Sequence, residues 1–383
     1  MDDVLRSAVE DGDVVGVVAV VVDASGPVYE AAYGRRTAAP DGDAPMSADT
    51  VFRVASMTKA VTATAVMQLV EHGRIALDQP VEDILPAFGE LQVLAGFSGE
   101  APRLRPPEGR ATVEQLLTNT CGLAYETWNA DVARYQRTTG VPSVASGRRA
   151  AFRNPLVCDP GTRWEYGPGL DWAGQVVESV SGQRLDIYFQ QHLLGPLRMP
   201  DTAFRLSEDQ RSRLATVHRR EEDGTLTPRP PKTPREMEFL SGGQGLYSTA
   251  RDFARFLLML LAGGSLDGGQ VLRQESVLRM MRNSIGELDV IPQRTVMPRV
   301  SNDVEFFPGR RKKHGLGLQV LAEDVPGMRA AGAVDWAGLF NTYYWVDPVH
   351  GIAGAIFTQI LPFFDARTLR VYEAFERAVY AQR

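Results

Sequence analysis

Ser56 and Lys59 are the residues whose types and spacing point most directly to chemistry, in the tetrapeptide Ser56-Met57-Thr58-Lys59. Residues i and i+3 share one face of a helix, so the Ser56 hydroxyl and the Lys59 amine can meet. At a helix N-terminus the Ser56 backbone N–H can donate to an oxyanion. A hydroxyl becomes an effective nucleophile when a base takes its proton, and Lys59 can be that base or act electrostatically on a nearby phenol. The structural alternative is that Ser56 caps the helix and Lys59 is a solvated helix residue.

A second cluster runs from Asp159 to Gly167 and carries a candidate phenol, Tyr166. A Pro-Gly turn precedes Trp164 and Tyr166, and an apolar helix is expected to begin at Leu170. A tyrosine in a loop before a helix can point into a cleft. The alternative is a tyrosine of the core or of its rim.

A third cluster, Asp335 to Leu339, lies just before an expected strand at Asn341. Its small pair Ala337-Gly338 would let a substrate approach the backbone closely. An ordinary turn with a packing Trp336 is the alternative.

The elements that must position these clusters follow from hydrophobic patterning. Residues 56–72 repeat apolar positions every three to four residues and predict a buried helix, preceded by a short strand over 51–54. Near the start, runs over 14–22 and 28–33 flank a turn and predict an antiparallel hairpin. Further strands are expected over 316–321, 328–333, 341–346 and 352–358. Helices are expected over 4–10, 113–117, 170–180, 185–192, 208–214, 250–261, 275–281 and 369–380, with Pro-rich connectors at 102–107 and 228–234.

Strands therefore occur at both ends of the chain, and helices dominate its middle. This order predicts an α+β fold, in which an antiparallel sheet built from both termini is flanked by helices and carries an inserted helical lobe. We expect residues 1–77 and 246–383 to form the sheet domain and residues 78–245 to form a mainly helical domain.

Composition excludes several classes of function. The 383 residues carry a net charge of −6, which argues against a nucleic-acid partner. The dense cationic run Arg310 to Lys313 is predicted to be a solvated loop. Cys121 and Cys158 lack metal-ligand spacing, so a zinc site is not expected. The run Gly242-Gly243-Gln244-Gly245 is too short for a dinucleotide fingerprint, so no cofactor is expected either. The five histidines are predicted to be satisfied surface or core residues, and no Gly-x-Ser-x-Gly elbow occurs.

The start of the chain, Met1-Asp2-Asp3, is acidic where a secretory signal would be basic. The apolar run over 14–22 is too short to cross a bilayer as a helix. A soluble, cytoplasmic protein without a membrane partner is the expectation, and the oligomeric state stays open.

The three clusters together resemble the serine β-lactamase and penicillin-binding-protein superfamily. The resemblance is strongest to its esterase branch, the family VIII carboxylesterases, which look like class C β-lactamases, and the segments 166–167 and 170–174 also resemble the acyltransferases of statin biosynthesis. It extends over nearly the whole chain, through residues 52–59, 115–123, 159–167, 242–249, 336–338 and 359–363. The implied fold is β-lactamase/transpeptidase-like, with the active site between sheet and helical lobe.

The resemblance also implies roles. Ser56 matches the acylated nucleophile, Lys59 its partner and Tyr166 the general base of the superfamily. Trp336-Ala337-Gly338 stands where the superfamily has Lys-Thr-Gly, so these residues are expected to bind substrate. The backbone N–H groups of Ser56 and Leu339 would then form the oxyanion hole. Tyr125, with Trp128 and Phe363, is a further candidate for the lining of the cleft.

Departures from the superfamily pattern narrow the range of substrates that we expect. The tyrosine motif reads Tyr166-Gly167-Pro168, without the usual third-position Asn, and Trp336 replaces the usual lysine. Both changes favour neutral esters over β-lactams and leave weak β-lactam hydrolysis open. Asn119 and Cys121 replace a usual His and Ser, and Cys121 is not expected to be catalytic.

The sequence thus predicts a serine carboxylesterase that hydrolyses small to medium acyl esters of small molecules through an acyl-Ser56 intermediate, without cofactor or metal. Three alternatives remain: an acyltransferase that moves the acyl group to an alcohol, an amide hydrolase or D-aminopeptidase, and a catalytically silent binding or sensor protein.

Overall fold

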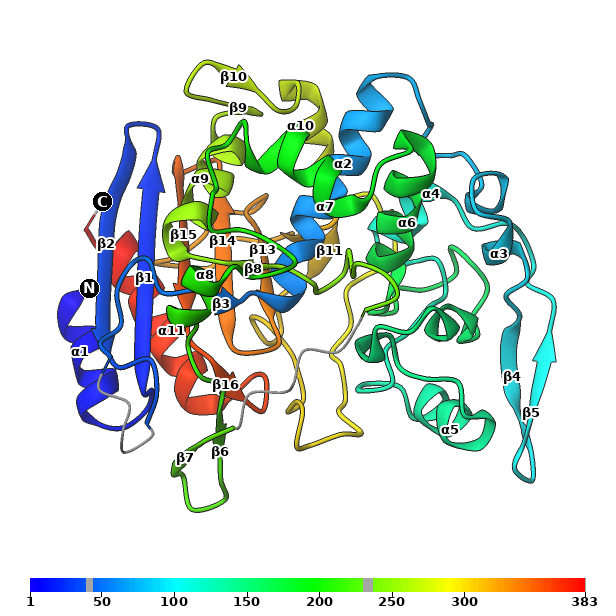
Figure 1. Ribbon diagram of the computed structural model, residues 1–383, viewed down its shortest axis with the longest axis horizontal. Coiled ribbons are helices and arrows are strands. Elements are labelled where there is room, and N and C mark those ends of the chain that lie inside the picture. Colours follow the sequence, from blue (N-terminus) through cyan, green and yellow to red (C-terminus); the bar gives the residue numbers. More distant parts are fainter. Residues whose placement is uncertain (39–43, 230–236, 383) are drawn as a thin grey trace.

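A seven-stranded antiparallel sheet organises the computed structural model, which describes residues 1–38, 44–229 and 237–382 (Figure 1). The strand order is β11-β12-β13-β14-β15-β1-β2. Strand β1 pairs with β15 in a register that sets Val20 opposite Ala355, so strands from the two ends of the chain are neighbours inside one sheet. The strands are β1 (Gly16–Asp23), β2 (Gly26–Gly34), β11 (Lys312–His314), β12 (Gln319–Leu321), β13 (Val334–Gly338), β14 (Thr342–Asp347) and β15 (Ile352–Phe357). The predicted α+β fold, with one sheet built from both termini, is confirmed.

Helices cover both faces of this sheet, which explains why β1 is apolar at nearly every position. Side chains alternate between the faces of a strand. Val17, Ala19 and Val21 point to a core shared with α1 (Asp2–Glu10) and α11 (Ala366–Tyr380). The intervening Val18 and Val20 point to a second, larger core that includes α9 (Ala250–Leu261) and α2 (Thr58–Glu71).

Helix α2 is the central support of the site. Every residue from Thr58 to Leu69 is buried, so the helix is enclosed on all sides, with Lys59 and Gln68 among its buried polar side chains. It packs against α6 (Gly169–Ser181), which in turn contacts α4 (Val113–Leu117), and these helices lie toward the lobe opposite β1 and β2 (Figure 1). The remaining elements are α3 (Pro86–Gly89), α7 (Leu185–Phe189), α8 (Glu208–Ser212), α10 (Gln274–Met280), β3 (Phe52–Arg53), β6 (His218–Arg220), β7 (Leu226–Pro228), β8 (Tyr247–Ser248), β9 (Ser265–Leu266), β10 (Gly269–Gln270) and β16 (Ile360–Leu361). The division at residues 77 and 245 stays a prediction.

The predicted strand over 328–333 is wrong, because this segment turns. Gly327 and Gly332 adopt φ values of 71° and 88°, in the left-handed region that favours glycine. Between them, Arg329 is fully buried and its Nε donates to Glu376 Oε1 at 2.5 Å. The strand begins instead at Val334, so the cluster at 335–339 lies mostly on β13 rather than in a turn.

The prediction of a solvated loop over the cationic run is only partly correct, because Arg310 and Arg311 lie in a loop, with Arg311 exposed, whereas the two lysines do not. Lys312 and Lys313 lie on β11 and are buried. The Lys312 ammonium donates to the Phe306 carbonyl at 2.7 Å, and the Lys313 ammonium donates to the Gly286 and Leu288 carbonyls at 2.7 and 2.6 Å. Backbone carbonyls, together with Asp289 Oδ1 at 2.9 Å from Lys313 Nζ, thus replace water around the two charges.

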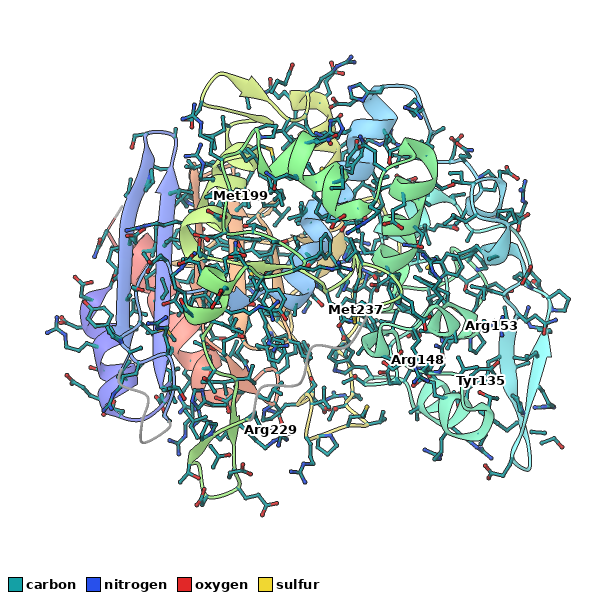
Figure 2. All side chains as sticks on the ribbon, viewed as in Figure 1. Tyr135, Arg148, Arg153, Met199, Arg229 and Met237 are labelled. Atoms are coloured by element: carbon teal, nitrogen blue, oxygen red, sulfur yellow. The ribbon has the colours of Figure 1, made fainter. Side chains whose placement is uncertain are left out.

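Several elements in the middle of the chain were not predicted, among them a hairpin and a helix. The connector expected over 102–107 begins instead within a hairpin of β4 (Val93–Ser98) and β5 (Ala101–Arg105). Helix α5 (Ala130–Thr139) carries the buried Tyr135, which Figure 2 labels. The connector expected over 228–234 lies largely outside the described residues. Within the described ranges, no helix is both long and apolar enough to cross a membrane; a cytoplasmic location stays a prediction.

Candidate active site

Three side chains that were predicted to act together converge at the N-terminal end of α2. The Tyr166 hydroxyl donates to Ser56 Oγ at 2.6 Å. Lys59 Nζ donates to the same oxygen at 3.2 Å. The structure therefore brings the nucleophile candidate and both of its candidate partners into direct contact.

The chain makes a sharp turn to present Ser56. Strand β3 ends at Arg53, and a 3-10 turn over Ala55–Met57 leads into α2. Ala55 has a φ of 43°, a left-handed value that is strained for a residue with a Cβ. Such strain persists where the surrounding structure enforces it and is concentrated at functional sites. Here it sets Ser56, half-buried, at the start of the helix.

Lys59 is buried with all three of its N–H groups satisfied, so the solvated alternative for this residue is wrong. Only 1% of its surface is exposed. Besides Ser56 Oγ, its acceptors are the Tyr125 hydroxyl at 3.1 Å and the Gly243 carbonyl at 2.8 Å. Its Nζ also lies 4.8 Å from the ring centroid of Tyr166. A buried ammonium at this position favours negative charge on the oxygens around it.

The Tyr166 ring is held by an aromatic cage. The rings of Trp128, Trp336 and Tyr125 lie 5.3, 5.1 and 5.1 Å from it, centroid to centroid. The Trp336 indole N–H donates to the Tyr166 hydroxyl at 3.3 Å. The phenol oxygen therefore has a fixed donor on one side and Ser56 on the other.

Asn119 ties the backbone on both sides of Tyr166. Its carbonyl accepts from the Glu165 N–H at 2.8 Å, and its side-chain oxygen accepts from the Gly167 N–H at 3.5 Å. Its amide nitrogen lies 3.2 Å from His314 Nε2, while His314 Nδ1 lies 2.6 Å from the Gly315 carbonyl. These contacts fit a neutral ring with its proton on Nδ1, and burial lowers the pKa of His314 to about 4. The prediction of a satisfied core histidine is confirmed for this residue.

Cys121, near Asn119 in the chain, is buried. Burial raises the pKa of its thiol to about 12, so the thiolate needed for nucleophilic attack is suppressed. This agrees with the expectation that Cys121 is not catalytic.

Strand β13 passes directly beside the segment that leads to Ser56. A Cβ added to Gly338 would lie 2.3 Å from the Val54 carbonyl oxygen, so only glycine permits this approach. From the sequence, we expected the small residues here to let a substrate come close to the backbone. In the structure, the Val54 carbonyl just before Ser56 takes that place at Gly338. As a result Leu339, the predicted second oxyanion donor, lines the same pocket as Ser56.

The pocket at this junction has an empty volume of about 320 Å³. Trp336, Ala337, Trp128 and Phe363 line it, whereas Tyr125 contacts Lys59 and does not belong to the lining. Binding of substrate by Trp336, Ala337 and Tyr125 stays a prediction. The complete lining of the pocket consists of Ser56, Trp128, Tyr166, Gln293, Val304, Phe306, Trp336, Ala337, Leu339 and Phe363. Among the described residues no charged side chain belongs to this lining, so the cavity suits an uncharged, largely apolar group.

Part of the pocket wall comes from the long loop between α10 and β11, a contribution that sequence reasoning missed. This loop supplies Gln293, Val304 and Phe306, and the Lys312 contact to the Phe306 carbonyl anchors its end. One feature of the sequence could have drawn attention to the end of this loop: two of the four lysines of the chain are adjacent, at 312–313.

Asp171 was also missed, because an acidic residue in the first turn of a helix is an ordinary feature. In the structure it is fully buried at the start of α6. Its carboxylate accepts from the Tyr125 hydroxyl at 3.3 Å, from the Gly243 N–H at 3.2 Å and from the Ser241 hydroxyl.

An antiparallel sheet and a helical lobe that hold a serine, a lysine and a tyrosine around one pocket define the serine β-lactamase-like class. The chain belongs to the Beta-lactamase family, whose model matches residues 1–377.

The similarity to known proteins extends over nearly the whole chain. The lovastatin esterase of Penicillium rubens is 31% identical, with 99% of this chain and 98% of that protein covered. The monacolin J acid methylbutanoyltransferase of Aspergillus terreus is also 31% identical, with 100% and 95% covered. Among solved structures, the unliganded simvastatin synthase LovD of Aspergillus terreus matches with a TM-score of 0.87 at 30% identity, over 100% of this chain and 97% of that one. The hydrolase EstCE1 matches with a TM-score of 0.75 over 97% and 96% of the two chains, and at 21% identity it shows the fold alone.

Proposed function

We propose that the protein is a serine carboxylesterase that hydrolyses small to medium acyl esters through an acyl-Ser56 intermediate. The observation that carries the proposal is the convergence of Tyr166 and Lys59 on Ser56 Oγ, at 2.6 and 3.2 Å, beside an apolar pocket. Nucleophile and base within hydrogen-bond reach of each other are the geometric requirement for covalent catalysis.

In the acylation step, Tyr166 reacts as a phenolate, after its hydroxyl proton has passed to solvent, and takes the proton of Ser56. The Lys59 ammonium and the Trp336 indole N–H favour the negative charge on the phenol oxygen. Ser56 Oγ then bonds to the ester carbonyl carbon, and the carbonyl oxygen becomes an oxyanion that receives the backbone N–H groups of Ser56 and Leu339. When the ester C–O bond breaks, Tyr166 returns its proton to the departing alcohol.

In the deacylation step, water replaces the alcohol. Tyr166 takes a proton from the water, whose oxygen bonds to the acyl carbon of acyl-Ser56. The second tetrahedral intermediate collapses, the carboxylic acid leaves, and Ser56 Oγ recovers the proton from Tyr166. The enzyme returns to its starting state without a net change in charge.

The uncharged pocket lining supports a neutral, apolar acyl group. Trp336, which stands where the superfamily has a lysine, offers an indole N–H to Tyr166 rather than a cation to a substrate carboxylate. We therefore expect β-lactams, whose carboxylate needs such a cation, to be poor substrates.

Acyl transfer to an alcohol is the second candidate. It uses the same acyl-Ser56 intermediate, with an alcohol in place of water, and the similar Aspergillus terreus protein bears the name of a methylbutanoyltransferase. Product analysis with added alcohol acceptors separates the two. Formation of a new ester in preference to free acid would favour transfer.

The direct test is hydrolysis of p-nitrophenyl butyrate by the parent protein and by Ser56→Ala. The parent should release p-nitrophenol and Ser56→Ala should not. Ser179→Ala, which removes an exposed hydroxyl from α6, is the matched control and should retain the parent rate. Equal rates in parent and Ser56→Ala would overturn the proposal.

A further inference from the structure

A fully buried carboxylate, that of Asp171, is connected to the lysine of the site through one intervening residue. Asp171 touches none of the reacting atoms, yet two of its three donors, Tyr125 and Gly243, belong to residues that accept hydrogen bonds from Lys59. The Tyr125 hydroxyl, which donates to Asp171 at 3.3 Å, itself accepts from Lys59 Nζ at 3.1 Å. Lys59, Tyr125 and Asp171 thus form a continuous hydrogen-bonded chain that ends at Ser56.

Gly243 makes a second connection between the same two charged groups. Its N–H donates to Asp171 at 3.2 Å, while its carbonyl accepts from Lys59 at 2.8 Å. A Cβ at this position would lie 2.4 Å from Asp171 Oδ2 and 3.1 Å from the Tyr125 hydroxyl, so glycine is needed for the contact. Two short routes therefore fix the distance between the Lys59 ammonium and the Asp171 carboxylate.

The charges around Lys59 indicate what this geometry does. The three acceptors of Lys59 are all uncharged, so a buried ammonium lacks a directly bonded counter-ion. Burial raises the pKa of the Asp171 carboxyl, whereas attraction to Lys59 and the three hydrogen-bond donors favour its charged form, which supplies the opposite charge one layer away. The other titratable groups around the pair are Tyr125 and Tyr166, Glu126 beside Tyr125, and the neutral His314, which interacts electrostatically with Lys59.

We infer that Asp171 is a positioning residue of the acylation machinery: its carboxylate fixes Tyr125 and the Gly243 peptide so that Lys59 points at Ser56, and it provides the counter-charge of the buried ammonium. The inference rests on the proposed function, since it assigns a residue to the same site.

Asp171→Asn tests this directly, because the amide keeps the size of the carboxyl group and removes its charge. The Asn nitrogen donates, so the Tyr125 hydroxyl loses its acceptor. We expect kcat for p-nitrophenyl butyrate to fall about 10- to 100-fold, as for the loss of a hydrogen bond to a charged group. KM should change less than about threefold, since Asp171 does not contact substrate. Removing a negative charge favours the deprotonated form of nearby groups and so lowers their pKa. The ascending limb of the pH–rate profile should therefore move to lower pH.

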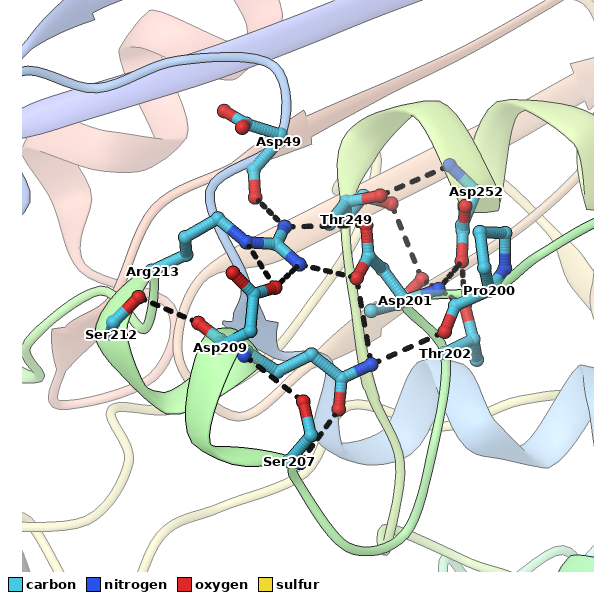
Figure 3. A network of polar contacts seen from close by, with 12 residues as sticks. Asp49, Pro200, Asp201, Thr202, Ser207, Asp209, Ser212, Arg213, Thr249 and Asp252 are labelled. Atoms are coloured by element: carbon cyan, nitrogen blue, oxygen red, sulfur yellow. Dashed lines mark hydrogen bonds and ion pairs between the residues drawn. The ribbon is translucent and has the colours of Figure 1, made fainter.

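Asp252→Asn is the matched control. Asp252 is another buried aspartate near a helix start, and its carboxylate accepts from the Asp201 N–H at 2.7 Å and the Thr202 hydroxyl at 2.9 Å. It belongs to the network of Figure 3, which is organised around Arg213 and does not include the residues of the active site. Asp252→Asn should leave kcat and the pH–rate profile at parent values, whatever it does to thermal stability.

A double-mutant cycle with Tyr125→Phe separates positioning from general destabilisation. If Asp171 acts through Tyr125, the double variant should lose much less activity than the product of the two single losses. If Asp171→Asn does not give the parent circular-dichroism spectrum, Ser241→Ala replaces it. That variant removes one donor to Asp171 and keeps its charge, so kcat should fall about threefold to tenfold with the pH–rate profile in place.

Parent kcat and an unmoved pH–rate profile in folded Asp171→Asn would overturn the inference, as would a parent kcat in Ser241→Ala where Asp171→Asn does not fold. Either result leaves the proposed function intact as long as Ser56→Ala is inactive. Failure of the parent itself to hydrolyse esters would instead overturn the proposed function.

Discussion

The hydroxyl of Tyr166 lies 2.6 Å from Ser56 Oγ, although 110 positions separate the two residues in the chain. Ser56 belongs to the turn before α2 and Tyr166 to the loop before α6, and these two helices pack against each other. The contact between the helices therefore sets the contact between phenol and hydroxyl. A change that displaces one helix from the other should affect catalysis before it affects substrate binding.

Removing the phenol oxygen of Tyr166 should slow catalysis while its ring continues to line the pocket. Tyr166→Phe is expected to lower kcat for p-nitrophenyl butyrate by about 10²- to 10⁴-fold, the range for loss of a general acid–base group. Tyr135→Phe, on α5 in the helical lobe (Figure 2), removes another buried tyrosine hydroxyl and should retain the parent kcat. A parent-like kcat in Tyr166→Phe would contradict the assignment of the base.

The indole of Trp336 should assist Tyr166 through its N–H. Trp336→Phe keeps an aromatic ring in the cage and removes the donor that lies 3.3 Å from the phenol oxygen. The expected loss in kcat is about threefold to tenfold, equivalent to about 1 kcal/mol for one neutral hydrogen bond. Steady-state kinetics check it, and a change confined to KM would indicate that Trp336 acts on substrate alone.

Filling the pocket should change the preferred acyl chain. Val304 is buried and lines the pocket, so Val304→Phe is expected to reduce kcat/KM for p-nitrophenyl hexanoate at least about tenfold more than for the acetate. Val296→Phe changes an exposed valine of the same loop and should leave the chain-length profile unaltered. An unchanged profile in Val304→Phe would place the acyl group elsewhere.

Acidification should destabilise the fold through His314. Burial lowers the pKa of this imidazole to about 4, against an ordinary value of 6.5, so between these values the unfolded chain binds more protons than the folded one. Stability therefore falls as the pH falls through this window, by an amount on the order of 3 kcal/mol from this residue. Urea unfolding at pH 7 and pH 4.5 should show a smaller pH dependence in His314→Gln than in the parent. His72→Gln, which changes an exposed histidine, should keep the parent dependence.

Local pattern predicted the parts of the site that depend on local geometry. The i, i+3 spacing of Ser56 and Lys59 fixes their approach as soon as the helix forms. The apolar strands at both ends of the chain required a common sheet, because neither group of strands could bury its faces alone. Tyr166 came from resemblance rather than from its own surroundings, since spacing alone does not bring a residue 110 positions away into contact.

The parts that were missed depend on where the backbone supplies partners. Lys312 and Lys313 look like surface charges until the carbonyls of 286, 288 and 306 surround them. Asp171 looks like an ordinary residue of a helix start until Tyr125 and Gly243 face it. Each of these groups is satisfied by segments distant in the chain, and a single sequence carries no periodic signal for such contacts.

The most direct measurement is the mass of the protein after rapid acid quench during turnover of p-nitrophenyl butyrate, followed by peptide mapping. The account predicts one butanoyl group on the peptide that contains Ser56 in the parent protein, and none in Ser56→Ala. Turnover in the parent with the acyl group found on another residue, or with the adduct retained in Ser56→Ala, would contradict it.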